Sequence, residues 1–270
     1  MLPEKWSVLE IEGYLASLNE NEQEKFLKLL ANDQRKTVQK LVQKHHSLRT
    51  KKLVEKERIL KMWEFEKKLY NNNYKFIVGI DEAGRGPLAG PIVAGAVILP
   101  PFCFIEGLND SKQLSQKRRE LIAKEIKSKA IKWAVGIVDA QTIDKINILE
   151  ATRYAMCLAV RSLGVLPEYA LVDGEKNSLL KIPQLGIIKG DSLSASIAAA
   201  SIIAKVTRDN IMEAYDKIYP GFNFAANKGY GTQQHLMAIL NNGCCPIHRR
   251  TFAPIKERAY TSDQAINFFD

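Results

Sequence analysis

The pattern of apolar residues along the chain changes at Asn71-Asn72-Asn73. Residues 1–70 contain few glycines and repeat their apolar side chains at helical spacing, whereas from Tyr74 onward runs of β-branched residues alternate with helical patterns. A length of 270 residues accommodates two domains. The sequence therefore predicts a small all-α N-terminal domain over residues 1–70, followed by an α/β domain.

The helical part opens with a clear start signal. Ser7 with Glu10 predicts a capping box at the start of a short helix. A second short helix is expected to carry the apolar residues Phe26, Leu29 and Leu30. A third would start near Asp33, and if it were continuous to Tyr70 it would be about 55 Å long at about 1.5 Å per residue. We expect a break in this helix, or an exposed arm.

The charge balance is basic, with 39 Lys and Arg against 30 Asp and Glu and a formal net charge of +9. Such an excess favours a polyanionic partner without identifying one. A basic run without any acid consists of Arg35, Lys36, Lys40, Lys44, Arg49, Lys51 and Lys52. This run is either a solvated helix face or a contact for nucleic-acid phosphates, whose affinity would depend steeply on salt.

Composition excludes several classes of protein. The hydrophobic fraction of 46% is too high for global disorder. The cysteines lack the ligand spacing of a zinc ribbon, which leaves buried or bystander thiols in a reducing cytosol as the interpretation. No secretory signal is visible, and no apolar run approaches the roughly 20 residues of a membrane span. We expect a cytoplasmic protein without a membrane partner. The cysteines are Cys103, Cys157, Cys244 and Cys245.

The second part predicts a mixed sheet. Strands are expected at Phe76–Ile80, Ile92–Leu99, Ile131–Val138, Tyr169–Val172 and Gly186–Lys189, and helices at Ser115–Lys129, Ile148–Leu163 and Asp191–Tyr215. The first two strands are joined by too little chain for a helical crossover, so they must pair antiparallel. The later strands alternate with helices, which favours parallel pairing. A roughly five-stranded mixed sheet with helices on both faces is the simplest solution.

Acidic residues follow several of these strands. Asp81 and Glu82 end the first strand, Asp173 ends the fourth, and Asp191 follows the fifth. Ligand sites of open α/β sheets form beyond strand ends, where separate segments converge. Carboxylates gathered there would repel one another unless cations held them, and about four of them would balance two divalent ions such as Mg²⁺ or Mn²⁺.

Each acid also has an ordinary explanation. Asp191 could be a helix N-cap, Asp173 with Gly174 a turn, and Asp81-Glu82 a solvated strand end. Adjacent residues of a regular strand point to opposite faces, so a turn must begin at Asp81-Glu82 for both acids to serve. Glu82 is the less secure ligand for this reason.

Two loops and one helix carry further candidates. Gly84-Arg85-Gly86 is not a nucleotide-hydrolase phosphate loop, because no Gly-Lys-Ser/Thr follows; it either lets backbone approach a ligand or is a tight connection. Lys228-Gly229-Tyr230-Gly231-Thr232 offers a cation and an aromatic ring to a sugar or base, unless the tyrosine lies in the core.

The Ala/Ser-rich stretch over residues 192–201 predicts close packing of a helix on the sheet, and the continuation of this helix contains Arg208. His248-Arg249-Arg250 is a phosphate contact or a surface ion-pair cluster.

Together these segments resemble ribonuclease HII, the bacterial type 2 ribonuclease H family. The similarity covers residues 74–258, leaving a tail over 259–270. It rests on Asp81 to Pro91, Asn109-Asp110-Ser111-Lys112, Val172-Asp173-Gly174, Lys189-Gly190-Asp191, Lys228 to Thr232 and His248 to Pro254. The related type 3 enzymes lack Gly-Arg-Gly after the first acids. Asn109 stands where the family often has Asp. The N-terminal helices resemble extensions of some Gram-positive members.

The resemblance implies an RNase H-like fold and an endonuclease acting on RNA–DNA hybrids and on ribonucleotides embedded in duplex DNA. Asp81, Glu82, Asp173 and Asp191 would be the catalytic acids and the ligands of two Mn²⁺ or Mg²⁺ ions. The enzyme would nick 5′ to the ribonucleotide, leaving a 3′-hydroxyl and a 5′-phosphate. The expected substrate-binding residues are Gly84, Arg85 and Gly86 through their backbone, Tyr230 beside the ribose, and Lys112, Lys189, Arg208, Lys228 and Arg249 at phosphates.

A second hypothesis is a non-catalytic nucleic-acid-binding protein on the same fold. The presence of all the acids argues against it. We expect a monomer.

Overall fold

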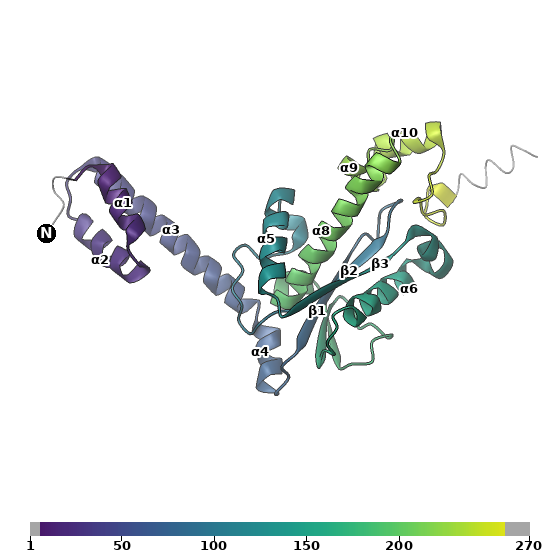
Figure 1. The fold of residues 1–270 in the computed structure, drawn as a ribbon, viewed down its shortest axis with the longest axis horizontal. Coiled ribbons are helices and arrows are strands. Elements are labelled where there is room, and N and C mark those ends of the chain that lie inside the picture. The colour runs from purple at the N-terminus through teal and green to yellow at the C-terminus, as the bar shows by residue number, and fades with distance from the viewer. Residues whose placement is uncertain (1–5, 257–270) are drawn as a thin grey trace, which may run out of the picture. The chain divides into compact units, whose positions relative to one another are not determined.

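The computed structural model describes residues 6–256, and the chain divides after Arg58 into two compact units (Figure 1). The division falls inside helix α3 (Lys36–Lys61). Each unit has a hydrophobic core of its own. The tail expected over 259–270 lies outside the described residues. Within residues 6–256, no helix is long and apolar enough to cross a membrane.

The first unit contains α1 (Val8–Ser17), α2 (Glu20–Leu30) and most of α3. The Ser7–Glu10 capping box is confirmed, and Asn19 with Glu22 forms a second one at the start of α2. Leu29 faces solvent, contrary to the predicted apolar stripe, because Leu27 occupies the inward position of α2. The core consists of Ile11, Leu15, Phe26, Leu27, Leu30, Val38, Leu41 and Val42.

The long third helix is broken, as expected. It ends at Lys61, and α4 (Glu64–Asn71) begins after a turn at Met62-Trp63. Both turn residues are buried in the core of the second unit, together with Ile59. Burial of these large side chains stabilises the turn, which explains why the helix breaks there.

The second unit is built on a five-stranded sheet of order β3-β2-β1-β4-β5. Its strands are β1 (Ile77–Ala83), β2 (Ile92–Ile98), β3 (Lys132–Val138), β4 (Tyr169–Asp173) and β5 (Gln184–Ile187). β1 and β2 pair antiparallel, and β1–β4 and β4–β5 pair parallel, as predicted. The mixed sheet is confirmed.

Strand β3 corrects one expectation, because it pairs antiparallel with β2 although a helix separates them. The helix α5 (Gln116–Lys129) returns the chain to the end of β2 rather than to its start. The N–H of Ile131 donates to the carbonyl of Ile98 at 2.9 Å, so β3 starts where β2 stops. A helix between two strands therefore makes them parallel only when the connection carries the chain back to the sheet edge at which the first strand started.

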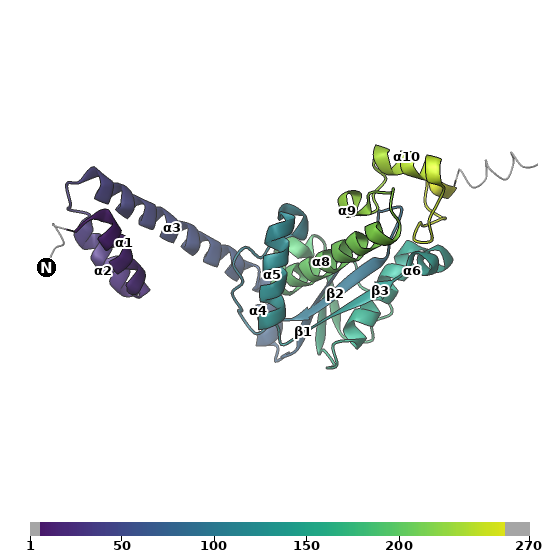
Figure 2. The same cartoon turned by 45° about the horizontal axis from the view of Figure 1, so that its top comes forward.

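Helices cover both faces of the sheet (Figures 1 and 2). α6 (Ala140–Arg161), bent at Asn147, packs on one face, and α5 with α8 (Ala195–Ile218) packs on the other. A Cβ on Gly79 would lie 2.0 Å from the backbone carbon of Ser196, and one on Gly95 would lie 2.4 Å from the Ala200 carbonyl oxygen. The small residues of α8 thus let it lie directly against β1 and β2, as predicted.

The remaining elements are short. They are η1 (Ser111–Gln113), α7 (Gly190–Leu193), α9 (Phe224–Asn227) and α10 (Gln233–Asn242). The single helix predicted over Asp191–Tyr215 is two helices, because the Ser194 hydroxyl accepts the N–H of Ile197 at 3.2 Å and caps a new start for α8.

Candidate active site

Strand register brings the predicted acids together. Ile80 of β1 is opposite Val172 of β4, so Asp81 and Asp173 follow paired positions on parallel neighbours. The N–H of Gly190, at the start of α7, donates to Oδ1 of Asp173 at 2.7 Å. This bond places Asp191, the next residue, beside the end of β4.

Asp81 and Glu82 occupy different environments. β1 continues through Ala83, so the turn begins later than expected. Asp81 is buried, and burial together with the charges of Glu82 and Asp173 raises its pKa well above the usual value. Burial also raises the pKa of Glu82, opposed by Arg85 at 3.6 Å and assisted by the charge of Asp173. The charge of Asp173 thus raises the pKa of both acids, although adjacent residues of a strand point to opposite faces of the sheet.

Asp191 has a partner that the sequence reasoning did not name as a site residue. Burial raises the pKa of the Asp191 carboxyl, and the charges of Asp110 and Asp173 add to the effect. Lys112 opposes it, with Nζ 3.9 Å from Oδ2 of Asp191. Asp110 lies in the Asn109–Lys112 motif already singled out, so its position in that motif was the available signal.

The donor set fits divalent metal ions. Carboxylate oxygens are the hard ligands that Mg²⁺ and Mn²⁺ prefer, and buried like charges with raised pKa values are the condition that a cation relieves. In the side-chain arrangement of residues 6–256, no three His, Cys, Asp or Glu side chains form a ready-made group around a single point. The fit therefore rests on charge, burial and proximity.

A glycine loop and an exposed tyrosine flank the acids. Gly84 has φ +101°, and a Cβ there would lie 2.1 Å from Nε of Arg208, so only glycine suits this position. Tyr230 is 47% exposed, which excludes the core alternative, and its Cε1 lies 3.8 Å from the place of a Cβ on Gly86. The N–H of Leu88 donates to the Gly229 carbonyl at 2.8 Å, joining the two loops.

Three predicted cations lie where their side chains can reach a ligand or an acid. Lys112 is 81% exposed in its side chain and close to Asp191. Lys189 is exposed immediately before α7. Lys228 forms an ion pair with Glu213 at 2.7 Å.

The two predicted arginines correct an expectation. Arg208 is 1% exposed and Arg249 is 0% exposed, and both guanidinium groups donate to backbone carbonyls. Fully buried groups cannot meet a phosphate at the surface. Their contacts instead support the Gly84–Gly86 and Lys228–Tyr230 loops.

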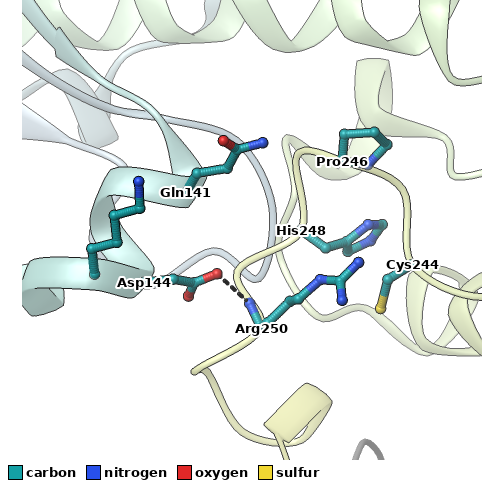
Figure 3. A pocket seen from close by; sticks show the side chains of 7 residues that line it. Gln141, Asp144, Cys244, Pro246, His248 and Arg250 are labelled. Carbon is teal, nitrogen blue, oxygen red and sulfur yellow. Dashed lines mark hydrogen bonds between the residues drawn. The ribbon is translucent and has the colours of Figure 1, made fainter.

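One pocket is lined by none of the four candidate acids. It has a volume of about 520 Å³ and is lined by Gln141, Asp144, Lys145, Cys244, Pro246, His248 and Arg250 (Figure 3). The Asp144 carboxylate accepts the N–H groups of Arg250 and Thr251 at 2.8 and 3.0 Å. This part of the molecule anchors the backbone that follows Arg249.

A mixed five-stranded sheet that brings buried acids to adjoining strand ends defines a metal-dependent nuclease of the ribonuclease H class. The family model described as Ribonuclease HII matches residues 78–255, and the one described as Ribonuclease HII N-terminal domain matches residues 7–70. The chain belongs to the ribonuclease HII family, which confirms the resemblance seen in its motifs.

Individual relatives agree. A Ribonuclease HII of Desulfitobacterium hafniense is 52% identical over 241 residues, covering 89% of this chain and 93% of the relative. A Ribonuclease HII of Bacillus cytotoxicus is 49% identical over 253 residues, covering 94% and 97%. The crystal structure of ribonuclease H2 from Pyrococcus horikoshii OT3 is 26% identical with a TM-score of 0.58, covering 70% of this chain and 99% of that one. The protein is a type 2 ribonuclease H, a metal-dependent endonuclease that cuts RNA strands.

Proposed function

We propose that this enzyme cleaves the RNA strand of RNA–DNA hybrids and nicks duplex DNA 5′ to embedded ribonucleotides, leaving 3′-hydroxyl and 5′-phosphate ends. The observation that carries the proposal is the convergence of Asp81, Asp173 and Asp191 beside the Gly84–Gly86 loop and Tyr230. Acids that fit metal ions and a surface that fits a ribose lie on one chain, and the proposed enzyme acts as a monomer.

The four acids Asp81, Glu82, Asp173 and Asp191 are the proposed ligands of two Mn²⁺ or Mg²⁺ ions. When bound, such ions supply a nucleophilic hydroxide at neutral pH and stabilise the charge of the leaving 3′-oxygen. Asp81 is the most deeply buried of the set and accepts the N–H of Glu82 at 2.7 Å, so its carboxylate orientation is held by the backbone. Lys112 stands beside Asp191, where its ammonium can meet a substrate phosphate.

Recognition of the ribose is assigned to the loop and the tyrosine. The 2′-hydroxyl is the group by which a protein distinguishes RNA from DNA. The proposed contacts are backbone groups of Gly84, Arg85 and Gly86, of which Arg85 and Gly86 are exposed. The exposed Tyr230 ring beside Gly86 can pack against the neighbouring deoxyribose. Lys189 and Lys228 are the remaining proposed phosphate contacts.

The N-terminal extension over residues 1–70 is proposed to contact nucleic acid through its basic run. Arg35, Lys44 and Arg49 are occupied by ion pairs with Asp33, Glu12 and Glu24. The lysines of the run that stay exposed, and form no ion pair within the described residues, are Lys36, Lys40, Lys51 and Lys52. Their replacement by Gln should weaken duplex binding and flatten its salt dependence, because each lost phosphate contact removes about 0.9 from the log–log slope. An unchanged slope would contradict this role.

The test of the catalytic proposal is Asp81→Asn, assayed with Mn²⁺ on a duplex containing one ribonucleotide. Cleavage should be lost while duplex binding persists. Glu175→Gln is the matched control, since Glu175 is an exposed acid two positions beyond Asp173. If the wild-type enzyme leaves this duplex intact but binds it, the non-catalytic alternative replaces the proposal.

A further inference from the structure

The carbonyls of the glycine loop point inward to a buried arginine. Arg249 donates from Nη2 to Gly84 O at 2.6 Å, from Nη1 to Arg85 O at 2.9 Å, and from Nε and Nη2 to Gly90 O at 3.0 and 2.9 Å. A planar guanidinium can serve several acceptors in fixed directions, as no other side chain can. The loop peptides are therefore held in one orientation.

Peptide geometry then determines what faces the substrate. In a trans peptide the carbonyl of one residue and the N–H of the next point in opposite directions. Since the Gly84 and Arg85 carbonyls point to buried Arg249, the N–H groups of Arg85 and Gly86 point away from it, on residues that are exposed. In the described part of the chain, neither N–H donates a hydrogen bond to a protein atom. Both are available to an acceptor on a ligand.

A second buried arginine joins this loop to that of Tyr230. Arg208 donates to Ala89 O at 3.1 Å, to Pro91 O at 3.0 Å and to Lys228 O at 2.9 Å. The neighbouring acid, Asp209, pairs instead with Lys205 and Arg119. Within residues 6–256, neither Arg208 nor Arg249 takes part in an ion pair.

Two buried cations without carboxylate partners are costly for stability. Burial and the charge of Arg208 lower the pKa of Arg249 to about 9. A charged donor on a peptide carbonyl polarises the whole peptide group, so the N–H on its other end becomes a stronger donor. The stability lost by burying these arginines is therefore accompanied by stronger N–H donors at the surface of the Gly84–Gly86 loop.

We infer that Arg249 is a positioning residue for ribose recognition: it orients and polarises the two peptide groups whose N–H donors, on Arg85 and Gly86, read the 2′-oxygen. Arg208 holds the Tyr230 loop against the same segment. The Asp144 clamp on the Arg250–Thr251 backbone fixes the chain immediately after Arg249 (Figure 3). This inference rests on the proposed function and deepens it.

The test measures how strongly the protein prefers a duplex with one ribonucleotide over an all-DNA duplex, and does not measure cleavage. In an Asp81→Asn background, Kd is measured for a duplex with one ribonucleotide and for the all-DNA duplex of the same sequence, both with Mn²⁺. Arg249→Lys keeps the charge but cannot reach all three carbonyls, so the preference for the ribonucleotide duplex should fall about tenfold, while Kd for all-DNA stays unchanged. A purely structural role would shift both Kd values by the same factor and preserve their ratio.

Two further variants make the result interpretable. Arg250→Lys is the matched control, because Arg250 is the exposed neighbour and it contacts Asp144 through its backbone N–H. Arg208→Lys should reduce the preference for the ribonucleotide duplex less than Arg249→Lys does, because the carbonyls that Arg208 binds belong to Ala89, Pro91 and Lys228 and not to Gly84 or Arg85. If Arg249→Lys does not fold, Arg208→Lys is the variant in which the preference is measured. An unchanged ratio in Arg249→Lys, or an equal loss in Arg250→Lys, overturns the inference. Absence of any preference in the Asp81→Asn parent overturns the ribose-recognition proposal itself, and the inference with it.

Discussion

The backbone N–H of Gly190 donates to the Asp173 carboxylate at 2.7 Å. This single bond ties the end of β4 to α7, and thereby sets the separation of Asp173 from Asp191. A Cβ on Gly190 would lie 2.6 Å from Cδ1 of Ile197 and 3.2 Å from Oδ1 of Asp173. The close approach explains why glycine stands here although its backbone is not left-handed.

Gly190→Ala should therefore raise the Mn²⁺ concentration for half-maximal cleavage several-fold, because Asp173 must shift away from the added methyl group. The rate at saturating Mn²⁺ should change less. Gly13→Ala, in α1 with nothing within 4 Å of its Cβ position, is the control and should leave metal activation as it was. Metal titrations of cleavage compare the two; equal half-maximal concentrations would show that the separation of the acids is not set at Gly190.

Removing one of the crowded charges should stabilise the metal-free protein. The pKa of Asp81 is raised by burial and by the charges of Glu82 and Asp173, so its ionised form is less favourable folded than unfolded. The metal-free fold consequently binds more protons than the unfolded chain, and its stability falls as pH rises through the raised pKa. At pH 7.5, Asp81→Asn should stabilise the metal-free protein and should reduce the stabilisation that Mn²⁺ brings. Urea melts with EDTA and with Mn²⁺ measure both effects; a less stable metal-free variant would contradict this account.

The position of the N-terminal cut should decide whether the catalytic unit folds. A cut after Arg58 follows the compact units, whereas a cut after Tyr70 follows the change in sequence pattern. The second cut removes Trp63, 1% exposed, and Glu66, whose Oε1 accepts Ser194 Oγ–H at 2.7 Å and Ser196 N–H at 2.9 Å at the start of α8.

We therefore expect the protein lacking residues 1–58 to fold and cleave, and the one lacking residues 1–70 to lose about 3 kcal/mol or more of unfolding free energy. Thermal melts and cleavage assays distinguish them. Equal stability of the two truncated proteins would mean that residues 59–70 add nothing to the catalytic unit.

A buried histidine pair should make stability depend on pH. His248 Nε2 lies 3.1 Å from His235 Nε2, beside Cys245, and burial with the charge of His235 lowers the pKa of His248 to about 4. The unfolded histidine titrates near 6.5, so between about pH 6.5 and 4 the unfolded chain binds more protons. Stability is complete above pH 6.5 and falls as pH decreases, by roughly 3 kcal/mol from this group.

The slope of stability against pH is the measurement, taken from urea melts between pH 7.5 and 4.5. His248→Gln should flatten it, whatever its effect on stability at pH 7.5. His46→Gln, which changes an exposed histidine of α3, should keep the wild-type slope. An equally steep slope in His248→Gln would exclude the pair as its source.

Local signals in the sequence predicted most of the strands and helices and singled out the candidate acids. Three signals depend only on residues close together in the chain. They are the Ser7–Glu10 box, the alternation of strands and helices after Tyr74, and the acids near the ends of β1 and β4 and after β5. Hydrophobic period and capping act over a few residues, so they can be recognised without knowing the fold. The Gly-Arg-Gly tripeptide belongs to this group, whereas the exposure of Tyr230 was decided only by the fold.

Only the tertiary structure decided the direction of β3, the place of Asp110 beside Asp191, and the burial of Arg208 and Arg249. Sequence patterns cannot distinguish an arginine that meets a phosphate from one that supports a loop, since both are cations near glycines. The difference lies in contacts such as that between Arg249 and Gly84, which are 165 positions apart. Burial and hydrogen-bond partners are properties of packing between distant segments, and only the folded chain brings those segments together.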